Sequence, residues 1–167
     1  MRAEIIGVGN QTRYQNAFLS SREYLSRELA SLGITLGSIR LVPPRTAEVF
    51  AQLLEGSRQG DLVLVLTAPE PAAAQAVTDA ICDGLRLEPR TDATLARQIA
   101  RRAAQQGREL TRAEAETFSA APSGSRRILN STGLVQGCAI SAKKQLMLVL
   151  PAVPGELTAC FSSSVRQ

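Results

Sequence analysis

The stretch from Leu62 to Leu66 reads Leu-Val-Leu-Val-Leu and is apolar at every position. A strand with one solvated face alternates apolar and polar residues, whereas a parallel strand covered on both faces is apolar throughout. This stretch follows Gly60-Asp61 and leads into a turn, so it predicts a buried strand. The apolar spacing from Pro71 to Leu85 is helical, and strand and helix together predict an α/β unit.

The rest of the chain also divides into predicted strands and helices. Gly33 and Gly107 follow two helical stretches as stop signals, and Thr46 and Thr111 are expected to cap two others. Strands are expected at residues 3–8, 36–42, 138–141 and 146–150, with a brief segment at 127–129 before the last two. Further helices are expected at residues 16–32, from Thr46, at 91–106, from Thr111 and before residue 161.

Strands that alternate with helices indicate an α/β fold with three layers. We expect a mostly parallel sheet with helices on both faces and an antiparallel strand pair near the C-terminus, joined by a turn at residues 142–144. The length of 167 residues, without a repeat or a linker, predicts one domain over residues 1–167, with a frayed tail at residues 162–167.

Composition excludes several classes of function. The chain has no histidine, and its three cysteines show no metal-binding spacing, so a zinc site is not expected and three buried thiols are. The net charge of +4 is spread over scattered bases with few aromatic residues, which predicts a solvated basic face and not a nucleic-acid surface. The chain lacks a signal-like start and any apolar run of membrane length, so we expect a cytoplasmic protein.

Several short segments together resemble one family. The chain is similar to the N-terminal domain of the competence/damage-inducible (CinA) proteins, which share the molybdopterin-binding fold of the MoaB and MogA proteins. The resemblance covers nearly the whole chain. It rests on Glu4–Gly9, Tyr24–Ile34, Asp61–Thr67, Gly107–Thr111, Asn130 with Gly133 and Gly137, and Leu150–Leu157.

The ligand motifs depart from the family pattern. The first loop keeps Gly9 but lacks the Glu and the second glycine of the family's G-T-E-x-x-x-G. The second loop, T-G-G-x-G-x-x-x-x-D-x-T in the family, keeps Thr67 and Thr78 at its two ends. Its glycine positions hold Ala68, Pro69 and Pro71, and the acid that the resemblance implies is functional falls on Ala76. The resemblance implies ligand contact by the retained Gly9, Thr67, Thr78, Asn130, Gly133, Gly137, Pro154 and Glu156.

These losses remove specific chemistry. Paired glycines let a backbone approach an anion closely and direct N–H groups toward it, whereas proline has no N–H and a fixed φ. Alanine has no ionisable group and can neither bind Mg²⁺ nor transfer a proton. Glu70 and Asp79 are the remaining candidate acids near the second loop, although a solvated role is the simpler interpretation of both. The segment Ser123–Arg127 is interpreted as a surface loop that could also hold an anion.

Two functions remain open. The joint loss of glycines and acid favours a diverged, catalytically inactive domain that acts through a homo-oligomer, a dimer or trimer, or through a protein partner. The alternative is a working domain. Here the resemblance implies metal-dependent cleavage of ADP-ribose-like nucleotides, with Mg²⁺ as the metal, or binding of molybdopterin or a nucleotide. No nucleic-acid or membrane partner is expected.

Overall fold

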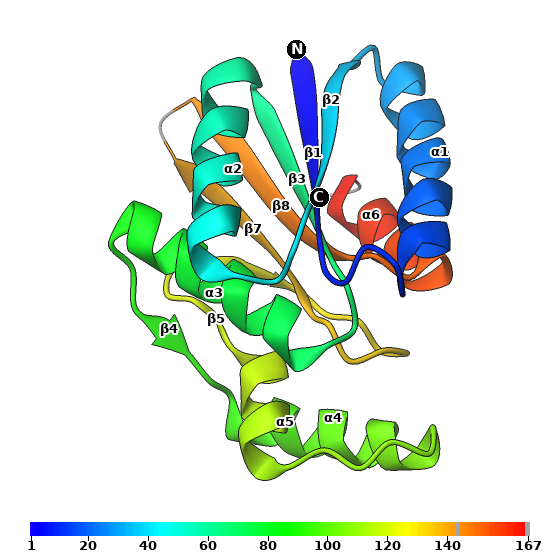
Figure 1. Cartoon of the computed structure of the whole chain (residues 1–167), viewed down its shortest axis with the longest axis vertical. Coiled ribbons are helices and arrows are strands. Elements are labelled where there is room, and N and C mark those ends of the chain that lie inside the picture. Colours follow the sequence, from blue (N-terminus) through cyan, green and yellow to red (C-terminus); the bar gives the residue numbers. More distant parts are fainter. Residues whose placement is uncertain (143, 166–167) are drawn as a thin grey trace.

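A six-stranded sheet forms the centre of the protein in the computed structural model, which describes residues 1–142 and 144–165 (Figure 1). Its first four strands in space run parallel, and the fifth is antiparallel to both of its neighbours. This confirms the expected fold class. In spatial order the strands are β2 (Thr35–Val42), β1 (Arg2–Val8), β3 (Leu62–Thr67), β8 (Gln145–Pro151), β7 (Gly137–Ala142) and β6 (Arg126–Ile128).

Helices cover both faces of this sheet. Figure 1 shows α1 (Gln15–Ser31) and α6 (Pro154–Val165) on one face and α2 (Thr46–Gln59) and α3 (Pro71–Leu85) on the other. The remaining helices, α4 (Ala93–Gln105) and α5 (Arg112–Ser119), pack on each other and form an arm at the edge where the parallel strands end. We call this pair the α4–α5 arm.

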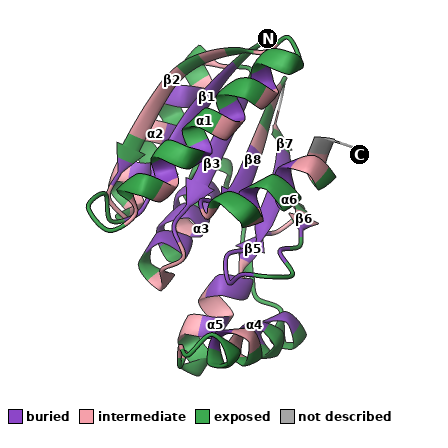
Figure 2. Ribbon diagram, turned by 90° about the vertical axis from the view of Figure 1, so that its right-hand side faces the viewer, coloured by how far each residue is buried: buried purple, intermediate pink, exposed green. Residues whose placement is uncertain are grey.

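The central strand has the burial that its sequence predicts. Every residue of β3 is buried, and Figure 2 shows the strand as continuous purple beneath the helices. Burying one large aliphatic side chain contributes about 1.5–3 kcal/mol, so such a strand fixes the middle layer. A second apolar cluster joins the arm to the body through Ala74, Leu95, Ile99, Ala103, Phe118, Leu134 and Val135.

The structure corrects the sequence predictions in two places, and a third prediction falls partly on a residue outside the described ones. Thr46 begins α2 and does not cap it, because the N-cap residue is Arg45 and no side chain caps that end. The helix α6 continues to Val165, so the tail expected from residue 162 is helical that far, and residues 166–167 lie outside the described residues. The expected turn at 142–144 contains residue 143, which also lies outside them.

A short strand pair was not predicted. β4 (Pro89–Arg90) and β5 (Ala121–Pro122) form a two-stranded antiparallel sheet beside α3. Each strand has only two residues, and one of them is a proline, which lacks a ladder donor. Sequence periodicity therefore gives no signal here. Thr111, in contrast, forms the expected capping box with Glu114.

Candidate functional site

The retained family motifs meet at one edge of the sheet. Val8 pairs with Thr67, and Thr67 pairs with Pro151, so the three strands end side by side. In open α/β sheets, ligands bind outside the carboxyl ends of the strands. The edge between these three strand ends, which we call the junction, is therefore the candidate site.

Ala68 fills the centre of the junction. Its exposure is 0%, and its β-carbon lies 2.4 Å from the place where a β-carbon on Gly9 would be. Gly9 is thus needed here so that the first loop can pass the methyl group of Ala68. A glycine at position 68 would leave that space open.

Three backbone donors of the two loops are already used. Ala68 N–H donates to the carbonyl of Val8 at 2.9 Å, and Glu70 N–H donates to the carbonyl of Ala68 at 2.8 Å. The residues between and after them are prolines, which have no N–H. In the first loop, Gly9 N–H donates to the Val42 carbonyl at 3.1 Å. None of these groups is available to an anion.

Glu70 supplies the last contact that closes the junction. Its Oε1 accepts a hydrogen bond of 2.9 Å from the backbone N–H of Asn10. The chain's own carboxylate therefore takes the position in which an anionic ligand would meet this donor. From the α4–α5 arm, Arg108 Nη1 donates to the Pro69 carbonyl at 3.1 Å and holds the third-strand loop from the other side.

A buried hydrogen-bond network centres on Asn130. Its Nδ2 donates to the Val135 carbonyl at 2.9 Å and to Glu156 Oε1 at 2.6 Å. Its Oδ1 accepts the backbone N–H of Gly133 at 3.1 Å, and its own N–H donates to Gln136 Oε1 at 2.8 Å. Asn130 is 4% exposed, so its polar atoms organise the loop before β7 and do not face solvent.

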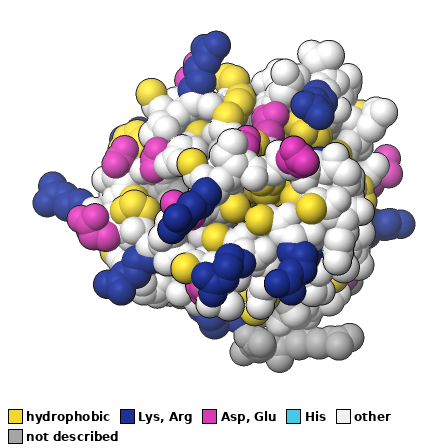
Figure 3. Space-filling model, turned by 90° about the horizontal axis from the view of Figure 1, so that it is seen from below, with side chains coloured by type: hydrophobic (Ala, Val, Ile, Leu, Met, Phe, Trp, Pro, Cys, Tyr) yellow, Lys and Arg dark blue, Asp and Glu magenta, His cyan; other side chains and the backbone are white. Residues whose placement is uncertain are grey.

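The α4–α5 arm is bonded to the same loop. Arg102 Nη1 donates to the carbonyls of Asn130, at 2.9 Å, and of Gly133, and Gln106 Nε2 donates to the carbonyl of Thr132 at 3.0 Å. The scattered bases were expected to form a solvated face, and Arg102 is a correction to that prediction, because it is half-buried and bonded to the loop. Figure 3 shows other basic side chains interspersed with apolar and acidic ones.

Glu156 titrates in an unusual environment. Burial raises the pKa of this carboxyl above its ordinary value of 4.5, although the hydrogen bond from Asn130 and the charge of Arg102 act in the opposite direction. The folded state therefore binds this proton more tightly than the unfolded state. The resulting stabilisation is present below the ordinary pKa and is lost as the pH rises through the raised one.

Glu156→Gln is expected to flatten this pH dependence. The amide oxygen can still accept the bond from Asn130, but the side chain no longer has to ionise in a partly buried place. Urea unfolding from pH 4.5 to neutrality should show the wild type losing stability relative to the variant. Glu23→Gln, an exposed change on α1, should follow the wild type. Equal slopes for wild type and Glu156→Gln would contradict the assignment.

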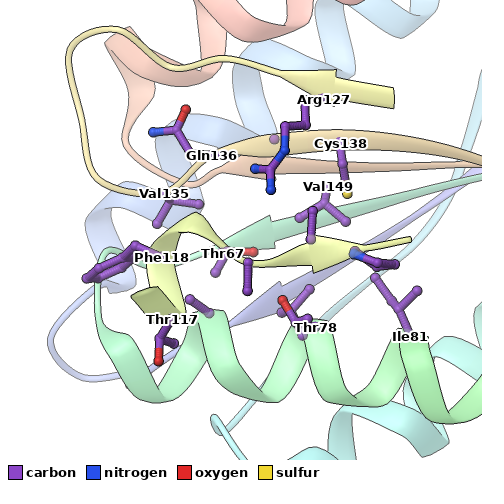
Figure 4. Close-up of a pocket in the computed structure, with 16 residues that line it drawn as sticks. Thr67, Thr78, Ile81, Thr117, Phe118, Arg127, Val135, Gln136, Cys138 and Val149 are labelled. Atoms are coloured by element: carbon purple, nitrogen blue, oxygen red, sulfur yellow. The ribbon is translucent and has the colours of Figure 1, made fainter. Parts of the chain in front are cut away.

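The other predicted residues lie in different places. Thr67 and Thr78 line a small cavity behind the junction together with Gly137, which begins β7 (Figure 4). A β-carbon at Gly137 would lie 2.7 Å from the Val149 carbonyl oxygen, so glycine is needed there for strand packing. Pro154 is exposed at the start of α6.

Neither Asp79 nor position 76 faces an open site. Asp79 Oδ1 accepts a bond of 2.9 Å from Gln75 Nε2 on the same helix. Ala76, the position of the family's acid, is 2% exposed and belongs to the main core. In residues 1–142 and 144–165, no group of three or more histidine, cysteine or acidic side chains could hold a metal ion. The side chains present at the junction therefore do not fit Mg²⁺.

Sequence reasoning missed the residues that bond the α4–α5 arm to the two loops. It also missed side-chain contacts between residues that lie far apart in the sequence. Arg108 lies in the Gly107–Thr111 segment, on which part of the resemblance rests. Its place in the chain could therefore have indicated that it contributes to the site. The bonds of Arg102 and of Gln136 had no such signal. No helix of the described chain has the length and apolarity that a membrane crossing requires.

Comparison with known proteins agrees with this geometry. Residues 4–167 match the family model described as "Probable molybdopterin binding domain". A CinA-like protein of Chlorobium luteolum is 27% identical over 173 residues, and a protein of Desulforamulus reducens named competence-damage inducible is 25% identical over 166. Each alignment covers 99% of this chain, which spans 39% and 40% of those two proteins.

Solved structures show the same fold. The CinA protein of Thermoplasma acidophilum superposes with a TM-score of 0.80 at 17% identity, over 99% of this chain and 96% of that one. MoaB of Thermus thermophilus gives a TM-score of 0.53 at 20% identity, over 99% and 89%. The arrangement of strands and helices is therefore shared well beyond the similarity of sequence.

Proposed function

Because the chain belongs to the molybdopterin-binding domain family, we propose that it is a CinA-type domain that has kept the fold and lost the ligand chemistry. On this proposal it acts in the cytoplasm by associating with copies of itself, as a dimer or trimer, or with a protein partner. The supporting observation is that the junction is closed by the chain's own groups: the Ala68 methyl fills it, and Glu70 takes the Asn10 donor.

The energetic consequence supports loss of binding. A hydrogen bond to a charged group contributes about 1.5–3 kcal/mol, and a factor of ten in affinity corresponds to about 1.4 kcal/mol. Ligand entry would have to break the bond from Asn10 to Glu70 and displace Ala68 from a packed position. Pro69 and Pro71 would still provide no donor in return.

Exposed apolar side chains support association with a second copy or with a protein partner. A groove between α2 and α3 exposes Phe50, Leu54 and Leu85 by 37%, 46% and 37%. Contiguous exposed apolar side chains are typical of surfaces that are covered by another protein.

One cluster of retained residues supports an alternative function. Asn130 and Gly133, retained from the third loop, and Glu156, retained from the last motif, lie together, and they could contact part of a nucleotide or a pterin. On this alternative the domain cleaves ADP-ribose-like nucleotides with a metal, or binds molybdopterin. It requires Glu70 to release Asn10 and the third-strand loop to move.

Self-association is tested by sedimentation velocity over a wide range of protein concentration. We expect a dimer or trimer that persists at micromolar concentration, because such an interface would cover the exposed apolar groups on α2 and α3. Leu54→Glu should weaken the assembly, whereas Leu129→Glu, at a site that is 66% exposed, should leave it intact. A monomer at every concentration would remove self-association from the proposal.

A further inference from the structure

A cavity behind the junction contains two buried polar atoms that have no hydrogen-bond partner among the residues that the structure describes. They are Oγ1 of Thr67, a residue only 1% exposed, and Nη1 of Arg127. Both residues line the same cavity, which lies between α3, α5 and β7 (Figure 4). Buried polar groups in folded proteins nearly always have a partner, so two unpaired ones in one cavity indicate that something polar occupies it.

The charge in this cavity is also uncompensated. Arg127 Nη2 donates to the Ser119 carbonyl at 2.7 Å, which uses one nitrogen but does not neutralise the guanidinium. Among the described residues, no carboxylate lies within ion-pair distance of Arg127, and none lines the cavity. Arg127 is half-buried, so its guanidinium has lost part of its water without gaining a counter-charge, which is unfavourable.

The nearby thiol does not provide that counter-charge. Burial raises the pKa of Cys138 to about 11, despite the lowering effect of the Ser125 hydrogen bond and the Arg127 charge. The thiol therefore stays neutral at physiological pH and can act only as a weak donor or acceptor. Thr78, on α3, adds a hydroxyl group to the lining.

The size of the cavity limits the ligand. About 20 Å³ is accessible to the centre of a water molecule, which is room for one small species and not for a phosphate ester or a pterin. Figure 4 shows the Arg127 guanidinium directed from β6 toward Thr67 and Thr78. The cavity thus combines a positive charge with hydroxyl groups and holds no acid.

We propose that this cavity is a binding site for a small monatomic anion of the size of chloride, held by the Arg127 guanidinium and the Thr67 hydroxyl. An anion would satisfy both unpaired donors and neutralise the half-buried charge, whereas a water molecule could satisfy only the hydrogen bonds. The site joins α5 and β5 to the sheet from behind the junction. It is independent of the proposed function.

The test is thermal unfolding at constant ionic strength with gluconate exchanged for chloride. We expect the melting temperature of the wild type to rise by about 3 °C at high chloride, because a ligand that binds only the folded state stabilises it. A crystal grown in bromide should show an anomalous peak beside Arg127 Nη1. A melting temperature that does not change with chloride, or a cavity without bromide, would show that water alone fills it and overturn the proposal.

Two matched variants locate the effect. Thr67→Val removes the unpaired hydroxyl and should lose at least half of the chloride-dependent shift while remaining folded at low chloride. Thr117→Val makes the same change in another residue of the lining, but that hydroxyl donates to the Ala113 carbonyl at 3.0 Å, and the full shift should remain. An unchanged shift in Thr67→Val would contradict the site as described.

Discussion

Replacing Gly133 with alanine is expected to destabilise the folded protein by about 3 kcal/mol, which combines the cost of overpacking with that of an unpaired buried group. A β-carbon at this position would lie 1.7 Å from Glu156 Oε1 and 2.7 Å from Asn130 Nδ2. Either the Glu156 carboxylate moves and leaves Asn130 Nδ2 with one partner fewer, or the whole loop shifts and strains the bonds from Arg102. Chemical denaturation of the purified variant measures the loss.

Gly155→Ala is the matched control for this change. No atom lies within 4 Å of a β-carbon built on Gly155, which precedes Glu156 in the first turn of α6. That variant should be neutral or slightly more stable, because alanine favours a helix over glycine by up to about 1 kcal/mol. If Gly133→Ala were as stable as the wild type, the contact between this loop and Glu156 would not be the close one described.

Restoring the family's acid, by Ala76→Asp, is expected to cost about 3–5 kcal/mol, the range for an uncompensated charge in a core. Ala76 is 2% exposed among apolar residues, so the new carboxylate would lose its water without gaining a partner. Position 76 is part of the core in this chain. Urea unfolding near neutral pH measures the effect.

Ala72→Asp makes the same substitution one turn earlier on α3, where the residue is exposed. An acid in the first turn of a helix is favourable by about 0.3–1 kcal/mol. We therefore expect this control to be at least as stable as the wild type. An Ala76→Asp variant that unfolds like the wild type would mean that position 76 reaches solvent or a polar site, against the structure.

The parts of the fold that could be predicted are those that a local pattern determines. The apolar run of β3 predicted a strand buried on both faces, as observed. The helical pattern from Pro71 to Leu85 predicted the bounds of α3, because proline is well tolerated in the first turn of a helix. The capping box at Thr111 is likewise complete within four residues. Each of these signals lies within one element.

The closed junction could be predicted only in part. The substitutions at positions 68 and 69 predicted lost donors, but no local pattern indicates that Glu70 would bond Asn10, a residue 60 positions earlier. The contacts of Arg102 and Arg127 could not be predicted for the same reason. A charged residue is usually solvated, and only the tertiary packing determines whether it has a partner within the protein. The strand pair β4–β5 is too short for periodicity to reveal.

Calorimetric titration of the wild type with ADP-ribose and Mg²⁺ tests most directly whether the junction has lost its ligand chemistry. We expect no saturable heat at millimolar ligand and no hydrolysis of the nucleotide, because the Ala68 methyl group fills the centre of the junction and the N–H groups of Gly9, Asn10, Ala68 and Glu70 are already bonded. Ala68→Gly combined with Glu70→Ala should bind more tightly than the wild type, since it opens the space and frees the Asn10 N–H. Saturable binding by the wild type at micromolar ligand, or turnover of ADP-ribose, would contradict the account.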